Sequence, residues 1–214
     1  MPSQGKVSLP VIKRLPKYYR YLSEMKQKGI TKVSSSELAK IMGTTASQVR
    51  QDFNCFGGFG QQGIGYEVNR LHTEIGSLLF KEDSLKTILI GTGRLGKAIS
   101  SYLNNDTRGY RLLAAFDIQD DVIGTQLCGM TIQHINQLKE FCKNHNPDVA
   151  VLCVPKLSAK ELAPTLVELG IKGFWNFSHY DLAVEYPNIM VENVHLGDSL
   201  MSLSYRVNSL EQHQ

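Results

Sequence analysis

Residues 90–98 read IGTGRLGKA and constrain the fold more than any other stretch of this chain. The apolar residues 88–90 just before them are typical of a buried strand in a parallel sheet. In this spacing Gly91 allows a tight turn, Gly93 lets the backbone approach a pyrophosphate, and Gly96 lets the next helix lie close to the strand. The start of that helix then faces the phosphates. The glycine pattern alone is weak, but the strand before it and the helix after it favour a dinucleotide-binding α/β domain.

A second apolar strand, YRLLAAFD, ends in Asp117, twenty-one residues after Gly96. A carboxylate at this place accepts hydrogen bonds from the adenine ribose hydroxyls and repels a 2′-phosphate, which favours NAD(H) over NADP(H). Arg94 in the turn argues against this preference, because an arginine could instead bind the 2′-phosphate of NADP(H). The alternative for Asp117 is a polar residue that simply ends a strand, and its spacing disfavours this interpretation.

Three more apolar strands are expected at residues 148–155, 171–178 and 188–194, with a helix at 159–169. The predicted class is therefore α/β, a Rossmann-type doubly wound parallel sheet. Ligands of such sheets bind outside the carboxyl ends of the strands. We expect NADH or NAD(+) to contact residues of four such ends: Gly91, Thr92, Gly93, Arg94, Leu95, Gly96, Asp117, Ile118, Val154, Pro155, Asn176, Phe177 and Ser178.

Charge separates the start of the chain from the rest. Residues 1–66 carry ten Lys and Arg against three Asp and Glu, a net charge of +7, whereas residues 67–214 carry a net charge of −4. Lys and Arg that neutralise phosphates release condensed counterions, so a basic head indicates a nucleic-acid partner. A solvated basic surface is the alternative, and charge alone does not separate the two.

The pattern of residues 15–54 predicts three helices. The first spans residues 15–28, and the second starts at a capping Ser34 or Ser35 and ends at Gly43 with an inward face of Leu38, Ile41 and Met42. The third starts at residue 45, where Thr and the Gln three residues on fit a capping box. The last two helices form a helix-turn-helix, with Val49 and Phe53 pointing inward.

Residues 56–66, FGGFGQQGIGY, follow the last of these helices and predict a hairpin. After a recognition helix, a hairpin is the wing of a winged helix, and a Gly-rich linker is the less favoured alternative. A helix at 67–81 then places Val68, Leu71, Ile75, Leu78 and Leu79 on one stripe. Double-stranded DNA is thus expected to contact Ser47, Gln48, Arg50, Gln51, Gln61, Gln62, Gly63 and Tyr66.

The sequence does not favour an enzyme. No Ser/Tyr-x-x-x-Lys or His-Asp arrangement singles out an acid or base, and His179 is the best catalytic candidate although a pocket-wall role suits it better. The four cysteines form no CxxC pair, which indicates a reduced, cytoplasmic protein with no expected metal site. No apolar run is long enough for a membrane span. Residues 196–210 form an amphipathic helix, either packed on the domain or a dimer element.

The order RLPKYYRYL, VSSSELA, QVRQDFNCFGGFGQQGIGY, IGTGRLGKA, AAFD, VP, GIKGFWNF and NV strongly resembles the Rex family of redox-sensing transcriptional repressors. The resemblance covers nearly the whole chain. It implies a homodimer with a winged-helix DNA-binding domain at 1–83, a Rossmann NAD(H)-binding domain at 84–194, and an exchanged dimerisation helix at 195–214. It also implies repression at a palindromic operator when NAD(+) prevails and release when NADH binds.

The sequence departs from the family pattern in three places. Gln51 replaces a Lys that many members have, and Ser178-His179 replace an Ala-Pro pair, which makes the nicotinamide pocket more polar. Members also often carry an Asp before the last helix that switches between an Arg of the first helix and a Tyr of the Rossmann helix. Here the residues implied for that switch are Arg20, Tyr102 and, in place of the Asp, His195, with the neighbouring Asp198 as the alternative.

Overall fold

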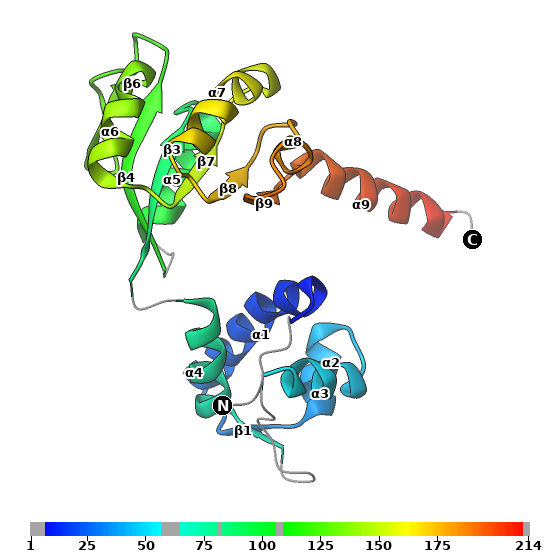
Figure 1. Ribbon diagram of the computed structural model, residues 1–214. Coiled ribbons are helices and arrows are strands. Elements are labelled where there is room, and N and C mark those ends of the chain that lie inside the picture. Colours follow the sequence, from blue (N-terminus) through cyan, green and yellow to red (C-terminus); the bar gives the residue numbers. More distant parts are fainter. Residues whose placement is uncertain (1–6, 57–64, 81–82, 106–108, 212–214) are drawn as a thin grey trace. The chain divides into compact units, whose positions relative to one another are not determined.

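A computed structural model describes residues 7–56, 65–80, 83–105 and 109–211 (Figure 1). The tip of the expected wing, with Gln61, Gln62 and Gly63, lies outside these ranges. The chain divides into two compact units, Met1–Glu82 and Asp83–Gln214. Each unit has its own hydrophobic core and is described by itself.

The first unit is a small helical domain with one short antiparallel ladder. Its helices are α1 (Leu9–Gln27), α2 (Ser35–Met42), α3 (Ala46–Asn54) and α4 (Val68–Leu79), and β1 (Lys32–Val33) pairs with β2 (Tyr66–Glu67). Helix α1 starts six residues earlier than the sequence predicted, because Pro10 stands in the first turn, where a missing N–H costs no hydrogen bond.

The helix-turn-helix forms as predicted, with both starts capped. Ser34 and Glu37 exchange the two bonds of a capping box, at 3.1 and 2.7 Å, and Gly43 ends α2 in the left-handed conformation. Thr45 accepts from the Gln48 amide at 3.1 Å. The prediction that the Gln48 side chain completes the capping box is wrong, because this side chain donates a hydrogen bond to Asp52, one helical turn away.

The core of the first unit follows the predicted stripes with two exceptions. Ile41 is 38% exposed and Leu78 is 47% exposed, although both were expected inside. In each helix the residue that follows lies inside: Met42 is buried, and Leu79 packs against the core. The largest buried side chains of this core are Tyr18, Phe53, Leu22, Leu38, Leu71 and Ile75.

The second unit is built on a seven-stranded sheet in the order β5-β6-β4-β3-β7-β8-β9. The strands are β3 (Leu85–Ile90), β4 (Tyr110–Asp117), β5 (Gln126–Leu127), β6 (Met130–His134), β7 (Val149–Leu152), β8 (Gly173–Asn176) and β9 (Met190–Asn193). All pairs are parallel except β5 with β6. The chain leaves β3 toward β4 and β6, then returns to the other side at β7, so the strand order reverses between β3 and β7. This is the doubly wound topology that the sequence predicted.

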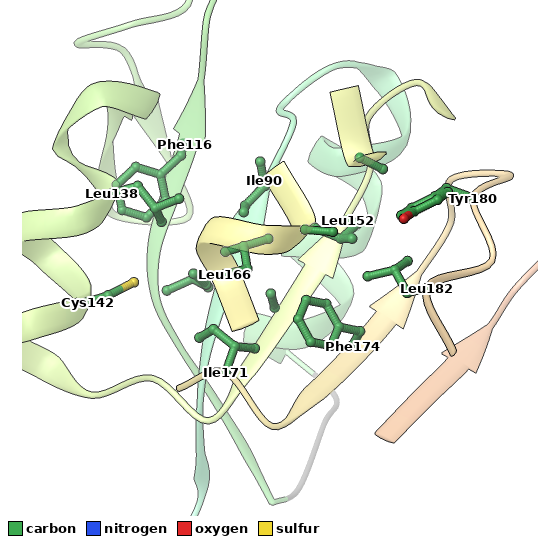
Figure 2. Close-up of a cluster of buried hydrophobic side chains, with 14 of the residues drawn as sticks. Ile90, Phe116, Leu138, Cys142, Leu152, Leu166, Ile171, Phe174, Tyr180 and Leu182 are labelled. Atoms are coloured by element: carbon green, nitrogen blue, oxygen red, sulfur yellow. The ribbon is translucent and has the colours of Figure 1, made fainter. Parts of the chain in front are cut away.

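Helices cover both faces of this sheet. They are α5 (Arg94–Asn105) on one face and α6 (Leu138–His145) and α7 (Lys156–Glu168) on the other, and a short α8 (Leu182–Glu185) and α9 (Leu196–Glu211) follow later in the chain. Ile88, Ile90 and Leu152 point to the face packed by α6 and α7, which Figure 2 shows in close-up. Leu89 and Val151 point to the opposite face, which is packed by Leu103 of α5. The alternation explains why these central strands are apolar throughout.

Helix α9 buries none of its large apolar side chains within the unit. All its described residues are exposed except Ser209, which is partly exposed, and Figure 1 shows the helix (red) extending from the end of the sheet that carries β9.

No helix within the described ranges is both long enough and apolar enough to span a membrane.

Candidate functional site

The glycine turn between β3 and α5 is tightly built on one side and open on the other. Gly91 has φ +91°, and a Cβ there would lie 2.5 Å from the Cys153 carbonyl oxygen. A Cβ at Gly96 would collide with the Gly91 carbonyl oxygen, whereas one at Gly93 would meet nothing within 4 Å. Gly91 and Gly96 therefore have the structural roles that their spacing predicts, and the contact of Gly93 with a pyrophosphate stays a prediction. Gly93, Arg94 and Leu95 are exposed at the start of α5, where an anion is favoured.

Asp117, at the end of β4, is hydrogen-bonded to this turn. Its Oδ2 accepts from the Thr92 amide and hydroxyl, both at 2.6 Å, and its Oδ1 accepts from the amides of Ile118 at 2.7 Å and Gln119 at 3.2 Å. Burial raises the pKa of this carboxyl, but the four hydrogen bonds outweigh burial and hold the pKa below its usual value. Asp117 is thus anionic at neutral pH.

The contact between Thr92 and Asp117 was not anticipated. Thr92 was predicted to contact the nucleotide, yet its side chain is fully buried and is used to hold Asp117. Ile118, the next residue, is 66% exposed and is free to lie against a bound base. The acidic side chain is therefore placed by the turn itself before any ligand binds.

The carboxyl ends of β7 and β8 are adjacent, as the nicotinamide prediction required. Asn176 is fully buried, and its Nδ2 donates to the Tyr180 carbonyl at 2.8 Å and to Asn193 Oδ1 at 2.7 Å. Its Oδ1 accepts from the amide and hydroxyl of Ser178, at 3.1 and 2.6 Å. The side-chain polar groups of Asn176 and Ser178 are thus used in hydrogen bonds within the domain. Asn193 takes part in this hydrogen-bond network, although the sequence did not suggest it.

Other predicted residues at this end remain accessible. Pro155 is exposed at the start of α7, and Val154 is partly exposed. Phe177 is also partly exposed, and its ring lies 4.9 Å from that of Trp175. Of the two residues that replace Ala-Pro, Ser178 is buried and His179 is exposed, so the more polar nicotinamide pocket stays a prediction that depends on His179.

His195 begins the connection to α9 and has close neighbours. Its Nδ1 lies 3.4 Å from Asp198 Oδ2, its ring lies 5.0 Å from the His179 ring, and its Nε2 is buried with no hydrogen-bond partner among the described residues. Tyr102 is half exposed on α5. Arg20 belongs to the other unit, with its guanidinium 5.3 Å from the Tyr21 ring. Exchange of partners among Arg20, Tyr102 and His195 stays a prediction.

The exposed face of α3 carries three of the residues that were predicted to contact DNA. Ser47, Arg50 and Gln51 are exposed, whereas Val49 and Phe53 are buried on the opposite face, as predicted. The Arg50 guanidinium donates to Ser35 Oγ at 3.0 Å, at the start of α2.

Tyr66 differs from its predicted place at the DNA surface. The residue is only 8% exposed, and its ring packs edge-on against Phe53 with centroids 5.0 Å apart. Pairing of β2 with β1 sets this direction, because alternate strand residues face opposite sides and Glu67 takes the outer one. Tyr66 is therefore a core residue of the first unit.

Asp52 is the residue of the first unit that sequence reasoning missed. Its fully buried carboxylate accepts from Arg14 Nε and Nη2, at 2.6 and 2.7 Å, from the Tyr18 hydroxyl at 3.0 Å, and from Gln48 Nε2 at 2.9 Å. Burial raises its pKa, but the bonds from Arg14, Gln48 and Tyr18 outweigh burial and lower the pKa below its usual value. The carboxylate ties α1 to α3. Its position between the buried Val49 and Phe53 was the available signal.

Fold and site together define a class: a helix-turn-helix domain joined to a Rossmann-type nucleotide-binding domain with an acidic residue after its second strand. The family model described as "Putative DNA-binding protein N-terminus" matches residues 6–54, and the one described as "CoA binding domain" matches residues 82–180. The redox-sensing transcriptional repressor Rex of Caldicellulosiruptor saccharolyticus is 48% identical over 94% of this chain and 92% of its own. The chain therefore belongs to the Rex family.

Solved structures agree with this assignment. A crystal structure of RSP with β-NADH is 39% identical, with a TM-score of 0.88, and covers 98% of both chains. RSP with β-NAD+ and operator DNA is 42% identical, with a TM-score of 0.89, and covers 98% of this chain and 96% of that one. RSP is described as a Rex-family repressor. Both the domain combination and the order of elements are thus shared with that repressor.

Proposed function

We propose that this protein is a dimeric transcriptional repressor that senses the NADH/NAD(+) ratio. It binds a palindromic operator when NAD(+) prevails and releases it when NADH binds, and it catalyses no reaction. The observation that carries the proposal is the combination, in one chain, of a basic helix-turn-helix domain with a glycine turn that holds Asp117.

The geometry of the turn supports NAD(H) as the effector. Asp117 is anionic and lies beside the open start of α5, so it favours ribose hydroxyls and repels a 2′-phosphate. Its oxygens already accept four hydrogen bonds, which is near the capacity of a carboxylate. Ribose hydroxyls that bind Asp117 therefore have to replace one of these hydrogen bonds or share its acceptor oxygen. The bond from the Gln119 amide, at 3.2 Å, is the longest of the four.

The exposed apolar face of α9 supports the dimer. The side chains that a partner would cover are more than 45% exposed, and they are Leu196, Leu200, Met201, Leu203, Tyr205, Val207 and Leu210. A monomeric protein rarely exposes so long an apolar run, and α9 is therefore assigned to dimerisation. A two-fold dimer reads a palindrome whose half-sites are whole turns apart, about 34 to 36 Å for each turn.

NADH and NAD(+) share their ADP half, so discrimination has to arise around the nicotinamide ring, near Pro155 and Phe177. Each ligand can shift DNA binding only by preferring a different arrangement of the dimer. The proposed route runs through α9 and the three residues that the family resemblance implies for the switch, which are His195, Tyr102 and Arg20.

The test is operator binding measured across NADH/NAD(+) ratios at fixed total nucleotide. DNA affinity is expected to fall as the NADH fraction rises, and Asp117→Ala should remove this dependence. A flat response of the wild-type protein overturns the sensor, even if both nucleotides bind. Steady NADH oxidation with a panel of small carbonyl compounds would overturn the assignment as a non-enzyme.

A further inference from the structure

One partly buried hydrogen bond fixes the orientation of the Gln48 side-chain amide on α3. Gln48 Nε2 donates to Asp52 Oδ1 at 2.9 Å, and Asp52 also accepts from Arg14 and Tyr18 of α1. An ionised carboxylate only accepts hydrogen bonds, so the Gln48 atom that faces it has to be the amide nitrogen. The orientation of the Gln48 amide is therefore set by chemistry, although oxygen and nitrogen look alike in most amides.

This orientation leaves Gln48 Oε1 and one N–H of its amide available. No group in the part of the chain that the structure describes donates a hydrogen bond to Oε1. Gln48 is partly exposed and adjoins Ser47, which is exposed. An acceptor next to a donor in one plane matches the N6 donor and the N7 acceptor of adenine in the major groove. Guanine offers two acceptors there, thymine an acceptor and a methyl group, and cytosine a donor alone.

We propose that Asp52 is a positioning residue that presents Gln48 to an adenine in each operator half-site. The inference rests on the proposed DNA-binding function, to which it adds one base and the residue that sets its recognition. Arg14 and Tyr18 hold Asp52 from a second helix, so the Gln48 amide is oriented before DNA arrives. Preorganisation of this kind removes part of the entropy cost of binding.

The experiment begins with selection of binding sites for the full-length wild-type protein from a randomised double-stranded library. Affinities are then measured for every single-base change of the selected half-site, with wild type, Gln48→Met and Asp52→Asn. Met keeps the length of Gln48 without its amide. We expect Gln48→Met to lose an adenine preference of about 5- to 150-fold at one position and to keep the others.

Asp52→Asn is expected to lose the preference at the same position. An Asn side chain offers both a donor and an acceptor, so the Gln48 amide can turn over. The matched control is Tyr18→Phe, which removes another bond to Asp52 and leaves the Gln48 contact in place. This control is expected to keep the adenine preference, even where it weakens binding to all sequences alike.

A second measurement needs no folded variant of Asp52. The adenine is replaced by 7-deazaadenine or by purine, which lack N7 or the 6-amino group, and both replacements should weaken wild-type binding but not binding by Gln48→Met. The proposal is overturned if wild type tolerates both analogues, if the Gln48-dependent base is not adenine, or if Asp52→Asn keeps the preference. Equal loss in Tyr18→Phe also overturns it. Selection that yields no sequence preference at all would instead refute specific DNA binding, the proposed function itself.

Discussion

At the residue scale, two glycines of one turn differ in what they tolerate. A Cβ at Gly96 would collide with the Gly91 carbonyl oxygen, whereas a Cβ at Gly93 would meet no atom within 4 Å. We expect Gly96→Ala to destabilise the second unit by about 1–3 kcal/mol through overpacking. Gly93→Ala should leave stability unchanged but weaken NADH binding, because the methyl group lies where a pyrophosphate approaches. Urea unfolding and NADH fluorescence titration check both; equal stability of the two variants would contradict the prediction.

Asp52 makes the stability of the first unit depend on pH. Its folded pKa is lowered, so its contribution is present above the unfolded pKa of about 3.9 and is lost as pH falls through the folded pKa. Asp52→Ala should lower the free energy of unfolding by about 3 kcal/mol at pH 7, the low end for a broken buried pair, because Arg14 is partly exposed. The difference from wild type should shrink below pH 4. Urea unfolding between pH 3 and pH 7 measures it, and a constant difference would refute the assignment.

The residue roles that could be predicted from the sequence are those that depend on neighbours a few positions away in the chain. The glycines of residues 91–96 and the caps at Ser34 and Thr45 act over a few positions, and the structure places them as expected. Asp52 was missed because its partner Arg14 lies 38 residues away. Tyr66 was misplaced for the same reason, since its burial depends on pairing between β2 and β1.

At the scale of elements, the strands that carry an apolar run were found from the sequence, whereas β5 and β6 were not. The sequence suggested no element between β4 and β7, yet β5, β6 and α6 lie there. β5 has only two residues, and β6 buries only Ile132, so neither has the apolar run that identified the central strands. The doubly wound class of the sheet could nevertheless be predicted, because the glycine turn between a strand and a helix is typical of that fold.

Packing within the second unit does not explain the apolar side chains of helix α9. If a partner covers it, Leu200 and Leu203 each contribute about 1.5–3 kcal/mol of apolar burial to the dimer. Leu200→Asp with Leu203→Asp should therefore give a folded monomer, measured by sedimentation velocity. The control is Ser202→Asp with Ser204→Asp on the same helix, which adds the same charge without removing an apolar side chain. Equal dissociation by both pairs would assign the effect to charge, and an intact dimer in the leucine pair would exclude α9 from the interface.

At the scale of the whole molecule, the two units have to influence each other, because the proposed effector and the DNA bind different ones. Such coupling is a free energy shared by both sites, and it is reciprocal at equilibrium. If NADH lowers operator affinity by a given factor, saturating operator DNA should lower NADH affinity by the same factor, typically about 5- to 150-fold. NADH fluorescence titration with and without operator duplex measures this factor, and a scrambled duplex is the control. An NADH affinity that operator duplex leaves unchanged would show that the two sites are not coupled, because any coupling at equilibrium has to appear in both affinities.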